Sequence, residues 1–116
     1  MIYNFPPTIF AGKNTISQQI YHITSEFDEV LEALTDYASL PDDSTNGEID
    51  RAFTQILCEI MDVYHAIETL CRMLEKKPNL PQTDRLIAAI KIKNHSRNYY
   101  LAELVCYPGR PPKKNG

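Results

Sequence analysis

Apolar residues along this chain recur at alternating steps of three and four, which is the spacing of a helix with one buried face. Prolines and glycines divide this pattern into three long segments. The first runs from Asn14 or Thr15 to about Ala38. Thr15 and Gln18 occupy the positions of a capping box at its start. Its apolar stripe consists of Ile16, Ile20, Ile23, Phe27, Val30 and Leu34. The pattern predicts one long amphipathic helix here.

The second segment opens at a second capping-box pair, Thr45 and Glu48, and continues to about Lys77, just before Pro78. Its stripe consists of Phe53, Ile56, Leu57, Ile60, Val63, Tyr64, Ile67, Leu70, Cys71 and Leu74. At the rise of an α-helix this segment would be roughly 45 Å long. Since a compact three-helix monomer of this size needs less, we expect something else to pack along it.

The third segment is predicted to be helical from about Gln82 to Glu103. Its apolar residues are Leu86, Ile87, Ile90, Leu101 and Leu104. Lys93 and Arg97 interrupt this stripe at core-facing spacing, where they would suit phosphate binding. The alternative is a helix that frays after Lys91 and leaves both cations exposed.

These patterns predict an all-α fold with three main helices per chain, in which oligomerisation completes a four-helix bundle core. No segment shows strand alternation of useful length. We expect an irregular N-terminal lead over residues 1–13, a helical domain over 14–104 and a flexible C-terminal tail over 105–116.

Composition and charge limit the classes of protein to which this chain can belong. A chain of 116 residues and 13.3 kDa is expected to form one domain, and its net charge of -3 gives no nucleic-acid footprint. Cys58, Cys71 and Cys106 match neither zinc spacing nor a disulfide framework, which favours a reducing compartment. No apolar run is long enough for a membrane helix, and no export signal is apparent. A cytoplasmic protein is therefore expected.

Two pairs of carboxylates carry the candidate chemistry. Glu26 and Glu29 are three residues apart in the first helix, and Glu59 and Asp62 repeat this spacing in the second. Like charges at this spacing destabilise a helix. Each pair lies on the same flank of its apolar stripe, so antiparallel packing would gather all four carboxylates, which repel one another unless cations share them. Oxygen-only ligands of this kind suit Mg²⁺, with Mn²⁺ as the alternative.

Simpler interpretations of these residues exist. An acidic pair on a helix is often only solvated, as we expect for Asp28 and Glu32. His22 and His65 flank the acidic pairs and could be recruited by a metal, but satisfied or exposed histidines are more common. A di-iron carboxylate bundle ranks far below Mg²⁺, because only "DVYH" approximates the E-x-x-H element that such a site repeats.

The order E-x-x-E, then E-x-x-D, then the basic "KIKNHSR" resembles the MazG-like all-α nucleoside triphosphate pyrophosphohydrolases, notably the small versions of phages and bacteria. The resemblance covers roughly residues 15 to 100. It implies a Mg²⁺-dependent hydrolase that converts a nucleoside or deoxynucleoside triphosphate to the monophosphate and pyrophosphate, a housecleaning activity on the nucleotide pool. It also implies a homodimer or homotetramer.

Residue by residue, the resemblance implies that Glu26, Glu29, Glu59 and Asp62 hold the metal, and that one of them orients or deprotonates the attacking water. It places Lys93, Asn94 and Arg97 at the substrate phosphates. For base stacking, the lead offers only Tyr3, Phe5 and Phe10, and the chain has no tryptophan. The alternative function is a non-catalytic helical oligomer that serves as a nucleotide-binding or protein-interaction module.

Overall fold

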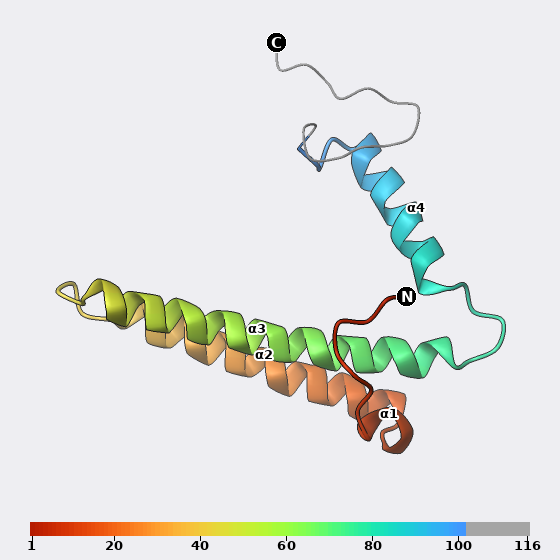
Figure 1. Ribbon diagram of the computed structural model, residues 1–116, viewed down its shortest axis with the longest axis horizontal. Helices are drawn as coiled ribbons and strands as arrows, with labels where there is room; N and C mark the ends of the chain where they lie inside the picture. Colours follow the sequence, from red (N-terminus) through yellow and green to blue (C-terminus); the bar gives the residue numbers. More distant parts are fainter. Residues whose placement is uncertain (102–116) are drawn as a thin grey trace, which may run out of the picture. The chain divides into compact units, whose positions relative to one another are not determined.

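The protein is all-helical over residues 1–101, the part of the chain that the computed structural model describes (Figure 1). The expected tail, residues 105–116, lies outside this range. The helices are α1 (Phe10–Lys13), α2 (Ile16–Ala38), α3 (Asn46–Glu75) and α4 (Thr83–Ser96). Three of them are long and correspond to the three predicted segments, whereas α1 is a single turn within the lead that was expected to be irregular.

The starts of α2 and α3 follow the predicted capping signals. Thr15 accepts a hydrogen bond from the Gln18 backbone N–H at 3.1 Å, and the Gln18 side chain accepts one from the Thr15 N–H at 2.8 Å. This reciprocal pair is a complete capping box. At α3, the Thr45 hydroxyl accepts from the Glu48 N–H at 3.2 Å. Both helices thus begin where the sequence predicted.

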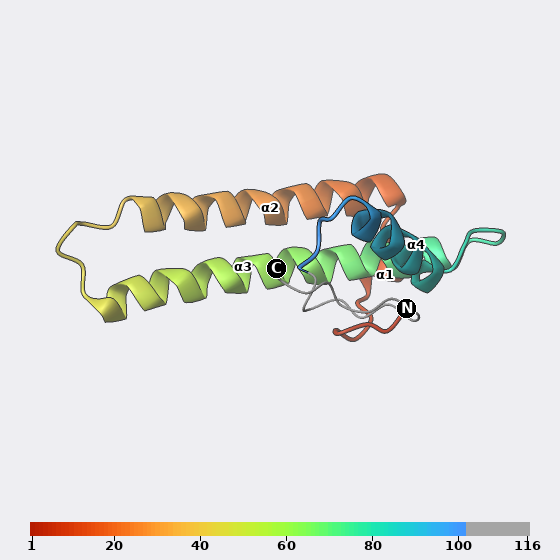
Figure 2. The same cartoon turned by 90° about the horizontal axis from the view of Figure 1, so that it is seen from above.

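Helices α2 and α3 form a long antiparallel hairpin, and they run side by side in both views (Figures 1 and 2). Val30 and Ala33 of α2 and Ala66 and Met73 of α3 are its buried apolar residues. Gln19 is buried with them, and its Nε2 donates to the Ala66 carbonyl at 3.0 Å. Because the alanines are small, the two backbones can approach closely along this line.

Much of the predicted apolar stripe lies beside the buried contact between α2 and α3 rather than within it. Ile20 is 50% exposed, Phe27 51% and Leu57 60%, so the hairpin by itself does not bury its whole stripe. At about 100° per residue, the exposed apolar residues of each helix lie on the flank opposite the acidic pairs. We call them the apolar face; they are Ile20, Phe27, Leu31, Leu34, Phe53, Leu57, Ile60 and Ile67.

Residues 2–9, which we call the N-terminal strap, lie across the C-terminal half of α3 (Figure 1). Glu68 of α3 is 2% exposed and accepts hydrogen bonds from the backbone N–H groups of Asn4 and Phe5, both at 2.9 Å. Arg72 donates to the Phe5 carbonyl at 2.7 Å and stacks on the Tyr3 ring at 3.9 Å. Both backbone polar groups of Phe5 are therefore held by side chains of α3.

The environment of Glu68 favours its charged form. Burial by itself raises the pKa of this carboxyl, but the hydrogen bonds from Asn4 and Phe5 and the charge of Arg72 more than offset burial, so the pKa lies below its ordinary value of 4.5. A carboxylate with a lowered pKa stabilises the folded state fully above pH 4.5, and this contribution is lost as the pH falls through the lowered pKa.

We expect Glu68→Ala to destabilise the Ile2–Leu80 unit by about 1.5 to 3 kcal/mol, the range for hydrogen bonds to a charged group. The variant should also expose the strap to proteolysis, because the Asn4 and Phe5 N–H groups lose their acceptor. Urea unfolding at pH 7 measures the change, with exposed Glu32→Ala as the matched control. If the two variants unfold at the same urea concentration, the hydrogen bonds between Glu68 and the strap contribute nothing to stability.

Helix α4 ends at Ser96, which contradicts the predicted extension to Glu103. Asn98 adopts a left-handed conformation with φ 57°, and its N–H donates to the His95 carbonyl at 3.0 Å. The Tyr99 N–H donates to the Asn94 carbonyl, also at 3.0 Å. These two bonds form a Schellman motif, which terminates a helix. Asparagine tolerates this backbone conformation better than most residues, and the apolar pattern of the segment does not reveal it.

The described chain divides into two compact units, one formed by Ile2–Leu80 and the other by Met1 with the residues from Pro81 onward. The first contains the strap, α1 and the hairpin, and the second contains α4. None of the helices within residues 1–101 combines the length and apolar character needed to cross a membrane.

Candidate functional site

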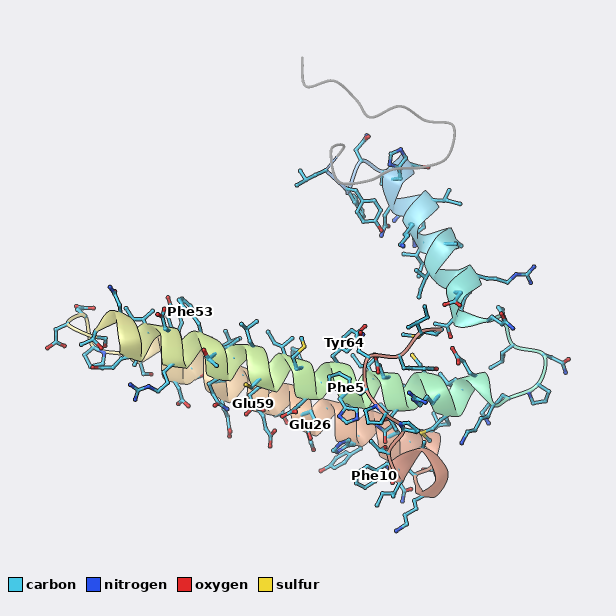
Figure 3. The ribbon with its side chains drawn as sticks, in the orientation of Figure 1. Phe5, Phe10, Glu26, Phe53, Glu59 and Tyr64 are labelled. Atoms are coloured by element: carbon cyan, nitrogen blue, oxygen red, sulfur yellow. The ribbon has the colours of Figure 1, made fainter. Side chains whose placement is uncertain are left out.

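The hairpin brings together the four carboxylates that the sequence singled out. One oxygen from each of Glu26, Glu29, Glu59 and Asp62 lies within 4.8 Å of the others. Glu26 and Glu59 come from facing positions of α2 and α3, and Figure 3 shows them near each other along the hairpin. Antiparallel packing with both acidic pairs on one flank therefore produces the carboxylate cluster that the spacing predicted.

The cluster has a half-buried part and an exposed part. Glu26 and Glu59 are half-buried, whereas Glu29 and Asp62 are exposed. The Gln55 amide donates to Oε1 of Glu59 at 2.7 Å and so fixes that side chain. The other oxygen, Oε2, is shielded from solvent and has no hydrogen-bond partner among the described residues. An unpartnered carboxylate oxygen beside three other carboxylates is a position that a cation would satisfy.

Crowding of negative charge changes the acidity of the cluster. A side-chain hydrogen bond with Glu26, together with the charge of that carboxylate, raises the pKa of Glu29 above its ordinary value of 4.5. The charge of Asp62 acts in the same direction. The raised pKa means that, without a cation, the cluster favours retention of a proton. A bound divalent cation would replace that proton and remove the repulsion.

The two histidines beside the cluster have ring partners. Nε2 of His22 lies 3.6 Å from Oε1 of Glu26, and its ring lies 5.7 Å from that of Phe10. His65 stacks on Phe5 with ring centroids 4.4 Å apart and planes at 18°. Nε2 of His65 is shielded and has no partner within residues 1–101. Neither histidine belongs to the four-carboxylate group.

Two cavities adjoin the cluster. The first, which we call the strap cavity, has a volume of about 210 Å³ and is lined by Glu26 and Asp62 together with residues of the strap, α1, α2 and α3. The second has about 200 Å³ and is lined by Glu29 and Glu59 with further acidic residues of α2. The carboxylates thus stand between a cavity with aromatic walls and one whose lining is strongly acidic.

The three predicted phosphate-binding residues lie on α4 and at its C-terminal cap. Lys93 is exposed on α4, and Arg97, at its C-terminal cap, lies over the Tyr99 ring at 6.0 Å. The Asn94 amide donates to the Tyr100 hydroxyl at 3.3 Å. All three residues belong to the unit that contains α4, so their role at the substrate stays a prediction.

Sequence reasoning missed the residues that support the site. Gln19 joins α2 to α3 and also accepts a hydrogen bond from the Asn14 side chain at 2.9 Å. Glu68 and Arg72 anchor the strap, yet at a spacing of four residues on a helix they resemble an ordinary surface ion pair. Their partners are backbone groups more than sixty residues away, which no local pattern reveals.

Comparison of the sequence and structure with protein-family models, curated proteins and solved structures finds no match. The chemistry of the site therefore has to be inferred from its own side chains. These provide a donor set made only of oxygens, with a shielded oxygen that lacks a partner among the described residues. Such a set could hold a metal ion, and oxygen-only ligands suit hard cations better than soft ones.

Proposed function

We propose that the protein is a Mg²⁺-dependent nucleoside triphosphate pyrophosphohydrolase, which cleaves a nucleoside or deoxynucleoside triphosphate to the monophosphate and pyrophosphate. The observation that carries the proposal is the convergence of Glu26, Glu29, Glu59 and Asp62 within 4.8 Å. Mg²⁺ usually keeps several waters and takes substrate phosphate oxygens as further ligands, so carboxylates alone can suffice on the protein side. The order of the motifs, which resembles that of the MazG-like enzymes, supports the same reaction.

Three of the carboxylates lie in positions that suit particular roles. Glu59, fixed by Gln55, offers its unpartnered oxygen to the metal from a half-buried position. Glu29 and Asp62 are exposed, so either can orient the attacking water or accept its proton. When bound, the metal lowers the pKa of water and neutralises charge on the phosphates.

The test is a panel in which the purified protein is incubated with each common NTP and dNTP and Mg²⁺, and pyrophosphate is assayed. We expect release of pyrophosphate from at least one nucleotide, abolished by a chelator, and a rise in melting temperature on addition of Mg²⁺. Absence of both effects would favour the alternative, a non-catalytic helical oligomer that binds nucleotides or proteins.

Lys93 is proposed to bind the substrate phosphates, with Asn94 and Arg97 beside it on the later helix. We expect Lys93→Ala to keep the thermal shift caused by Mg²⁺ but to weaken nucleotide binding by about 1.5 to 3 kcal/mol, because one charge-assisted contact is lost. Calorimetric titration with a non-hydrolysable nucleotide measures this, with Arg85→Ala on the same helix as control. Wild-type affinity in Lys93→Ala would transfer the phosphate contact to Arg97 or to a second subunit.

The apolar face supports the proposal that the protein is an oligomer. Its eight large side chains are all exposed in the single chain. A contiguous apolar surface of this kind is typical of a protein interface. We propose that a second copy of the hairpin covers it, which completes a four-helix bundle and leaves the carboxylates on the opposite flank.

A further inference from the structure

The strap cavity adjoins the proposed metal site, because Glu26 and Asp62 belong to both. Its volume of about 210 Å³ is small for a complete ligand. Pockets for drug-sized molecules hold roughly 300 to 1,000 Å³. The cavity therefore matches one part of a nucleotide rather than the whole molecule.

The charges around the cavity indicate which part. Two carboxylates line it, and no lysine or arginine is found among its described lining residues. Most other polar groups there are already paired: Gln19 bonds to Ala66 and Asn14, and the Thr8 hydroxyl lies 3.4 Å from that of Thr69. Phosphates would be repelled in such a cavity unless cations accompanied them, whereas an uncharged group would not.

The walls of the cavity suit a flat ring. Phe10 and His22 line it from α1 and α2, and His65 lines it from α3. Phe5 stacks on His65, and the hydrogen bonds of Phe5 to Glu68 and Arg72 hold that pair in place. In Figure 3, Phe5 and Phe10 lie at the same end of the hairpin, beyond Glu26. Aromatic side chains of this kind bind nucleobases by stacking, whatever the base.

We infer that the strap cavity binds the base of the nucleoside triphosphate, while the triphosphate extends toward the carboxylate cluster. This inference rests on the proposed function, which supplies the nucleotide. Phe10, His22 and His65 contact the base, and the strap positions Phe5 and His65. His65 lines the cavity, and its Nε2 atom, which has no partner among the described residues, can form a hydrogen bond with a base edge.

Nucleosides without phosphates test the cavity separately from catalysis. The chain has three histidines, of which His22 and His65 line the cavity and His95 lies on α4. We expect a nucleoside of at least one common base to shift the imidazole NMR signals of His22 and His65 but not that of His95. The signals are assigned with single His→Gln variants. No shift with any nucleoside, or equal shifts of all three, would overturn the inference.

Phe10→Ala supplies the second measurement. We expect it to weaken nucleotide binding roughly 5- to 150-fold, the range for loss of one aromatic stack on a base. Inhibition by inorganic tripolyphosphate with Mg²⁺, which has no base, should stay unchanged. Tyr21→Ala, at an exposed position of α2 outside the cavity, is the control. Wild-type nucleotide affinity in Phe10→Ala would contradict the inference even if turnover is confirmed, whereas nucleoside shifts without turnover would contradict only the proposed function.

Discussion

Glu59→Gln is expected to abolish the thermal shift caused by Mg²⁺ and to reduce nucleotide turnover by more than about a hundredfold. Removal of even the outer partners of metal ligands costs about 10- to 100-fold in affinity or activity, so loss of a direct ligand should cost more. The replacement keeps the size of the side chain and an acceptor for Gln55, so only the charge and the metal-binding oxygen are lost. Asp62→Asn should behave in the same way.

Stability without metal should respond in the opposite direction. In the metal-free protein Glu59 is one of four clustered carboxylates. A hydrogen bond with Glu26 and the charges of Glu26 and Asp62 raise the pKa of Glu29, whereas the hydrogen bond of Glu59 to Glu29 lowers it, so the contribution of Glu59 is the negative charge that it adds to the cluster. Removal of one charge relieves that repulsion, so the melting temperature of Glu59→Gln in chelator should equal or exceed that of the wild type. If Glu59 only stabilised the fold, the melting temperature of Glu59→Gln in chelator would be lower than that of the wild type.

Asp28→Asn is the matched control, because it removes one negative charge from an exposed position of α2 outside the cluster. It should leave both the Mg²⁺-induced shift and turnover unchanged. If Asp28→Asn and Glu59→Gln reduce Mg²⁺ binding equally, the cation responds to the overall charge of the hairpin rather than to a defined site.

The helices and the cluster were predictable because both depend on local periodicity. The capping residues Thr15 and Thr45 gave the helix starts, and the matching positions of Glu26 and Glu59 on their stripes gave the convergence of the carboxylates. Antiparallel packing of adjacent helices was the only further assumption, and the short connection between them favours it.

The strap and the choice of packing line could not be predicted in the same way. Glu68 is buried only because distant backbone groups lie against it, and periodicity carries no information on such contacts. The stripe of α2 could have packed along Phe27 or along Ala33, and the structure takes the line with the small residue. The early end of α4 depended on the left-handed conformation of Asn98, which the apolar pattern does not register.

The exposed apolar face predicts that a single substitution changes the oligomeric state. We expect the wild-type protein to sediment as a dimer or larger oligomer at micromolar concentration, and Leu57→Lys to sediment as a monomer. Leu57 is 60% exposed in the single chain, so the lysine is harmless there, but at an interface it would bury an unpaired charge. The melting temperature of the wild type should rise with protein concentration, and that of the variant should not.

Thr54→Lys introduces the same charge at an exposed position of α3 outside the apolar face, and it should leave the oligomer intact. Sedimentation velocity on the three proteins separates the explanations. Dissociation by Leu57→Lys alone assigns the interface to the apolar face, because Thr54→Lys adds the same charge to the same helix outside that face. Dissociation by both variants would point to general charge repulsion between chains. A monomeric wild type would remove the four-helix bundle from the proposal and leave the carboxylate cluster on a single hairpin.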